Sequence, residues 1–136
     1  MTVHAEIERF YAAQMQLLDR GAVKDWADTF TEDGTFAASG LPAPVRGRET
    51  IATSAGRAYE ERKARGVVHR HWLGMLVVDP SPDAEDEVRA RSYALVIEVP
   101  AGGAPALHRS TVCDDVLIRD GDRWLVRERL VTRDDL

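Results

Sequence analysis

Two histidines spaced two positions apart, His69 and His71, are the residues of this sequence best suited to chemistry. Period-two alternation around them predicts a β-strand, and the face that carries both imidazoles is otherwise apolar, so it is expected to line a cavity. An imidazole titrates near neutrality and can take or give a proton. His71 is therefore the candidate general acid or base, and His69 a second catalytic candidate. The alternative is a buried histidine that only satisfies a hydrogen bond.

Asp33 is the candidate partner of His71. A carboxylate at the end of the second predicted helix can hold an imidazole in one tautomer and raise its basicity. The alternative is ordinary turn chemistry, because Gly34 follows Asp33 directly and Asp-Gly is a common turn pair.

The His-x-His spacing can also chelate a metal, and His108 could in principle join the pair. Such a site needs a third ligand, often a carboxylate, and no feature of the sequence places one nearby. We therefore expect neither a metal site nor any other cofactor.

Bulky side chains elsewhere are candidates for the walls of the cavity, although aromatic residues and Met at such spacings also build ordinary cores. The predicted substrate-binding residues are Trp26, Phe30, Tyr59, Met75, Tyr93 and His108. The single cysteine, Cys113, is interpreted as a small buried residue, because no neighbouring charge would activate its thiol.

The spacing of apolar residues predicts the helices and strands that position these side chains, and this spacing changes once along the chain. Apolar residues recur at spacings of three and four up to Gly66, and at a spacing of two beyond it. The helical pattern predicts helices over residues 3–18, 23–30 and 47–65, with a short strand at 35–37. The alternating pattern predicts long strands over 67–78, 88–99, 107–119 and 123–132, separated by turns rich in Pro, Gly and Asp.

This order predicts an α+β fold: a cone-shaped, curved antiparallel β-sheet wrapped around three N-terminal helices, with an internal pocket. The length of 136 residues predicts a single domain over 1–136. Eighteen basic and 23 acidic residues give a net charge of −5, so we expect no nucleic-acid partner. No apolar run is long enough to span a membrane, no targeting segment is evident, and one cysteine excludes an internal disulfide. A cytoplasmic location is expected.

Four segments in this order resemble the SnoaL-like group of the nuclear-transport-factor-two superfamily. Residues 24–36 resemble its second helix and first strand, and 47–51 the start of its third helix. Residues 69–74 (HRHWLG) resemble its Arg-His-aromatic strand, and 115–126 its closing hairpin. The resemblance spans nearly the whole chain and implies the cone fold, which hosts several chemistries.

In dehydratases of this group, the histidine before the aromatic residue of the strand is the catalytic acid or base, and the matching residue is His71. The sequence departs from that pattern where the dehydratases carry a Tyr-Asp pair, because Gly21 and Ala22 stand there and Asp19 is the nearest acid. The region that carries the base in steroid isomerases reads Ala37-Ala38-Ser39. An enzyme with this sequence would therefore use a different set of catalytic residues.

Two hypotheses follow. The first is a cofactor-independent cyclase, dehydratase or isomerase (a lyase or isomerase) that moves a proton on an apolar, carbonyl-bearing metabolite such as a polyketide. The second is a non-catalytic binding or assembly module, similar to the small subunit of ring-hydroxylating oxygenases. A homodimer is expected in either case, because Val68, Trp72, Leu76 and Val78 are predicted to form an apolar outer face of the sheet.

Overall fold

The computed structural model describes all 136 residues of the chain. It contains three helices, α1 (Val3–Asp19), α2 (Val23–Ala27) and α3 (Arg48–Ala64). It contains six strands, β1 (Phe30–Ala38), β2 (Val45–Arg46), β3 (Val67–Pro80), β4 (Glu87–Pro100), β5 (Ala106–Asp120) and β6 (Arg123–Arg133). The predicted α+β class is confirmed. The second helix is shorter than predicted and the first strand longer, because Phe30 already pairs in the sheet. None of the helices is long and apolar enough to cross a membrane.

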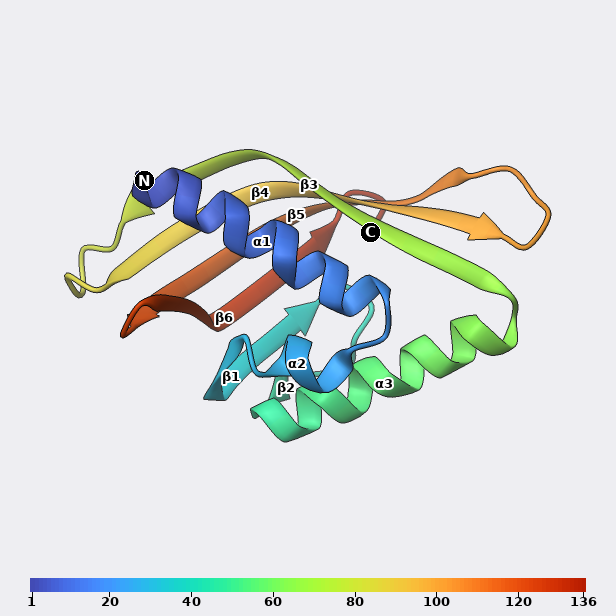
Figure 1. The fold of residues 1–136 in the computed structure, drawn as a ribbon, viewed down its shortest axis with the longest axis horizontal. Helices are drawn as coiled ribbons and strands as arrows, with labels where there is room; N and C mark the ends of the chain where they lie inside the picture. Colours follow the sequence, from blue (N-terminus) through green and yellow to red (C-terminus); the bar gives the residue numbers. More distant parts are fainter.

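All six strands form one curved sheet in the order β2-β1-β6-β5-β4-β3, and α1 lies across one of its faces (Figure 1). The strands β3 to β6 form the predicted antiparallel meander. The sheet is mixed rather than wholly antiparallel, because β1 runs parallel to β6, with Phe30 opposite Val126 and Ala38 opposite Val131. A parallel pairing between distant segments leaves no turn signal in the sequence, whereas each hairpin does.

A β-bulge in β3 reverses the predicted facing of its second half. The register with β4 shifts between Gly74 and Val77, and Met75 has a positive φ of 54°. One extra residue in a strand exchanges the two faces beyond it. Met75 is therefore 77% exposed, while Leu76 and Val78 pack against the core. This corrects the expectations that Met75 lines the cavity and that Leu76 and Val78 face outward.

The helix α1 packs one stripe of side chains against the sheet. Its buried residues are Ile7, Tyr11, Gln14 and Met15, at spacings that place them on one helical face. The side chain of Thr2 caps the helix by accepting a hydrogen bond from the backbone N–H of Ala5 at 3.1 Å. From this stripe, Ile7 and Tyr11 join Phe30, Leu117 and Val126 in the main apolar core.

A buried ion pair lies beneath α1. Arg129 on β6 donates two hydrogen bonds to Asp115, its cross-strand neighbour on β5, both at 2.9 Å. From α1, the Tyr11 hydroxyl donates to Asp115 at 2.5 Å, and Gln14 Oε1 accepts from Arg129 at 2.7 Å. Burial alone would lower the pKa of the Arg129 guanidinium, but the charge and hydrogen bonds of Asp115, together with Cys113 and Tyr11, outweigh burial and raise it. The pair joins two strands to α1.

Replacing Arg129 by Leu should lower the free energy of unfolding by about 3–5 kcal/mol, because it leaves the Asp115 carboxylate buried without a counter-charge. Denaturant unfolding followed by circular dichroism measures the change. The exposed pair of Arg91 and Asp114 offers a matched control, since Arg91→Leu should leave the midpoint nearly unchanged. Equal stability of the Arg129→Leu variant and the parent would contradict the role given to the buried pair.

Candidate active site

A cavity of about 460 Å³ lies between the three helices and the sheet. Its lining is mostly apolar, and every helix and strand of the fold contributes at least one residue to it. The exposed residues Gly40 and Leu41 also belong to the lining, so the cavity is open to solvent beside them. Its size and apolar walls suit a small organic molecule.

His71 lies in the wall of this cavity and is held by Asp19, the last residue of α1. The Nδ1 atom of His71 lies 2.6 Å from Asp19 Oδ1, and the backbone N–H of His71 donates to Asp19 Oδ2 at 3.0 Å. The two side chains are 20% and 8% exposed. Both carboxylate oxygens are thus committed to one residue, which fixes the imidazole relative to the end of α1.

This contact determines how the ring can act. An ionised carboxylate accepts a hydrogen bond, so the neutral imidazole of His71 carries its proton on Nδ1. Its Nε2 atom makes no hydrogen bond within the protein and has a free lone pair. A histidine oriented in this way can accept a proton at Nε2, with Asp19 as the compensating charge for the imidazolium that forms.

Asp33 does not fill the role predicted for it. It is exposed on β1, where its carboxylate accepts a hydrogen bond from Thr31 Oγ1 at 3.1 Å. The partner of His71 is Asp19, an acid the sequence shows at the end of the first predicted helix. Only the packing of α1 against β3 reveals the pairing, because 52 positions separate the two residues.

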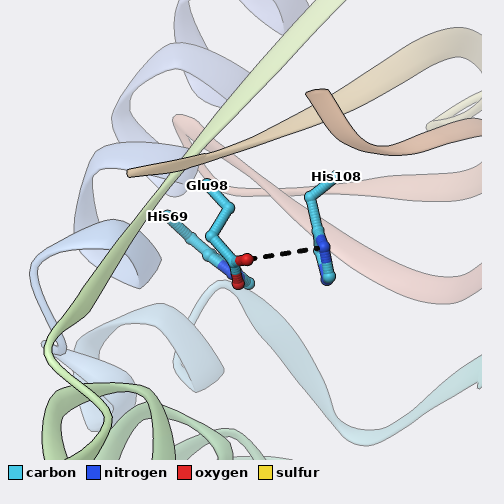
Figure 2. A group of neighbouring side chains, drawn as sticks. All are labelled: His69, Glu98 and His108. Carbon is cyan, nitrogen blue, oxygen red and sulfur yellow. Dashed lines mark hydrogen bonds and ion pairs between the residues drawn. The ribbon is translucent and has the colours of Figure 1, made fainter. Parts of the chain in front are cut away.

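The side chains of His69 and His71 lie on the same face of β3, but His69 makes a different contact. Its Nε2 atom lies 2.8 Å from Glu98 Oε1, and Glu98 Oε2 lies 3.8 Å from His108 Nδ1. Figure 2 shows the carboxylate of Glu98 beside both rings. Neither His69 nor His108 is part of the cavity lining, so the predicted catalytic His69 and wall residue His108 belong to a separate cluster.

The other predicted wall residues lie in different environments, and one of them lines the cavity. Trp26 lines the cavity, whereas Phe30 is fully buried in the core beside it. Tyr59 is half-buried on α3 and covers Gly21 outside the lining, where a Cβ on Gly21 would overlap its ring. Met75 and Tyr93 are 77% and 55% exposed on the other face of the sheet. Alternation along β3 predicts the wrong face for Met75, because the sequence does not show the bulge between Gly74 and Val77.

Three arginines in the lining were not foreseen from the sequence: Arg109, Arg129 and Arg133. Arg129 is fully engaged by Asp115 and Gln14, and Arg133 pairs with Asp135 at 2.6 Å. Arg109 donates only to the backbone carbonyl of His108 at 3.4 Å and has no carboxylate partner. It is therefore the guanidinium in the lining that is free to meet a negative charge on a ligand.

The model of the SnoaL-like domain family matches residues 1–130. Among solved structures, ActVI-ORFA from Streptomyces coelicolor is 34% identical, covers 98% of this chain and 96% of its own, and gives a TM-score of 0.90. Aln2 from another Streptomyces strain is 31% identical over 98% of this chain and 91% of its own, at 0.87. A Catenulispora acidiphila protein in complex with S-DNPA is 34% identical over 98% and 94%, at 0.83. No curated protein matches the chain.

Cys113 should resist alkylation although it borders the cavity. It is 3% exposed, and burial raises the pKa of its thiol to about 12, so almost no thiolate forms near neutrality. Iodoacetamide labelling followed by mass spectrometry should give little product in the native state at pH 8 and complete labelling in denaturant. Rapid labelling of the native protein would contradict this environment.

Proposed function

Because the chain belongs to the family of SnoaL-like domains, we propose that it is a cofactor-independent cyclase, dehydratase or isomerase. Its substrate is an apolar, carbonyl-bearing metabolite such as a polyketide, and its reaction starts with proton transfer at His71. The observation that carries this proposal is the Asp19–His71 pair in the wall of an apolar cavity. On this proposal, residues 1–136 act as one domain.

In the proposed reaction, Nε2 of His71 removes a proton from the carbon next to a substrate carbonyl. The electron pair of that C–H bond moves toward the carbonyl oxygen, which becomes negatively charged. Arg109, the cavity guanidinium without a carboxylate partner, would stabilise this oxygen. The proton held by His71 then returns to the substrate, either to another carbon or to a departing hydroxyl.

The apolar walls of the cavity would contribute to the reaction rate by positioning the substrate. Trp26, Leu73 and Val96 line the cavity together with His71, so a bound ring system would meet the imidazole at a fixed place. Exclusion of water would strengthen the interactions of the few polar groups in the site. The S-DNPA complex of the similar Catenulispora protein supports a small-molecule ligand for this cavity.

The alternative is a binding or assembly module without chemistry. A cavity of this kind would suit a carrier equally well, and the Tyr-Asp pair of the related dehydratases has no counterpart at Gly21 and Ala22. The two functions make different demands on Asp19. A carrier does not require the Nδ1 tautomer of His71, whereas a general base does.

The outer face of the sheet supports a homodimer. Val68, Trp72, Tyr93 and Leu107 are 46%, 69%, 55% and 63% exposed, and they lie on the neighbouring strands β3, β4 and β5. Exposed apolar side chains gathered on one sheet face favour association with a partner. The single free thiol of Cys113 is consistent with the cytoplasmic location that we propose.

The variants His71→Gln and Asp19→Asn should each reduce turnover by about 10²–10⁴-fold, because one removes the base and the other its orientation. Turnover on a panel of aromatic polyketides is compared with binding, which is measured by quenching of tryptophan fluorescence, because Trp26 lies in the cavity wall. His4→Gln, a change in an exposed histidine on α1, is the matched control. Binding without turnover by the parent on every compound would favour the carrier, whereas full activity of His71→Gln would contradict the catalytic role of His71.

Trp72→Glu should convert the proposed dimer into a monomer, because it puts a charge in the apolar outer face. Sedimentation velocity at micromolar concentration measures the state. The control is Val3→Glu, which changes an exposed apolar residue on α1 instead of the sheet. A monomeric parent protein, or a dimer that survives Trp72→Glu, would contradict the proposed interface.

A further inference from the structure

Three potential metal ligands meet at the end of the sheet beyond the cavity: His69, Glu98 and His108 (Figure 2). They come from β3, β4 and β5, and each follows from the pairing of those strands. His69 and Glu98 are direct cross-strand partners. His108 is the extra residue of a β-bulge, since Val96 pairs with Arg109 and the next residue of β4 pairs with Leu107. A bulge redirects side chains, which here brings an imidazole beside the Glu98 carboxylate.

The distances fit a single small cation. One nitrogen of each ring and one oxygen of the carboxylate all lie within 4.8 Å of one another. His69 Nε2 lies 2.8 Å from Glu98 Oε1, and His108 Nδ1 lies 3.8 Å from Glu98 Oε2. A tetrahedral zinc ion with bonds of about 2.0–2.1 Å holds its ligands roughly 3.3 Å apart. Small side-chain rotations are enough to close the cluster around an ion.

The donor atoms of these three side chains are ones that transition metals prefer. Two imidazoles and one carboxylate suit Zn²⁺ and other divalent first-row transition metals, and they leave a fourth coordination position open.

The positive charges of two arginines near the end of α3 would repel a cation bound by the three ligands. Arg65 lies 3.8 Å from Glu98 Oε1, and the charge of Arg62 also acts on His69. The Arg65 side chain is 61% exposed and holds Glu98 only at long range, so it can turn toward solvent when an ion binds. Its removal should therefore strengthen cation binding.

We propose that His69, Glu98 and His108 form a binding site for a divalent transition-metal ion such as Zn²⁺. The site lies outside the cavity lining and is separate from the Asp19–His71 pair. The ion joins β3 to the β4–β5 hairpin, which extends beyond the rest of the sheet (Figure 1). Its role is to fix this hairpin, and the proton transfer proposed for His71 does not depend on it.

Calorimetric titration of the metal-free protein with zinc sulfate tests the site without any substrate. We expect one ion per chain, and an affinity at least about tenfold weaker for Glu98→Gln and for His108→Ala. Arg65→Gln should bind zinc more tightly than the parent. His71→Gln should bind as the parent does, which separates the three-residue site from a His-x-His chelate. Zinc should also raise the unfolding midpoint of the parent.

Far-ultraviolet circular dichroism confirms that each variant is folded, so that a loss of affinity reports the ligand and not the fold. Absence of saturable zinc binding by the parent would overturn the proposal. So would an affinity that survives both Glu98→Gln and His108→Ala, or one that depends on His71. The Glu98 cluster would then be a set of hydrogen bonds that supports the hairpin.

Discussion

The buried ion pair between Arg129 and Asp115 is the contact on which the cavity depends. Both charges lie on the inner face of the sheet, where an apolar neighbour would leave them unsatisfied. Tyr11 and Gln14 satisfy them, so the middle of α1 is held against the sheet by hydrogen bonds as well as by apolar packing. Arg129 also lines the cavity, so the pair fixes one part of the cavity wall.

The same helix carries the orienting acid of the site. Asp19 lies two turns beyond Tyr11 on α1, and its carboxylate holds both the ring and the backbone of His71. Immediately afterwards the chain turns at Gly21, whose positive φ of 80° and close approach to Tyr59 leave no room for a side chain. The placement of Asp19 therefore depends on the buried pair at one end and on this turn at the other.

The sequence predicted those features that depend on local pattern. Alternation along 67–78 put His71 on the inner face, and the turn residues predicted each hairpin of the meander. It could not pair His71 with Asp19, because that contact depends on how a helix packs against a distant strand. It misplaced Met75, since a single bulge inverts the alternation beyond Gly74. It gave Glu98 no role, because only strand register sets that carboxylate against His69.

The parallel pairing of β1 with β6 has a consequence for how the protein is made. The strand β1 pairs in parallel with β6, which follows all the other strands along the chain and is therefore synthesised after them. Until β6 is made, the edge of β1 that will face β6 has no partner, and the apolar side chains of α1 and β1 have no complete sheet to cover them. Nascent chains that stall before β6 would therefore expose an open strand edge beside apolar surface, the combination that favours aggregation and recognition by chaperones.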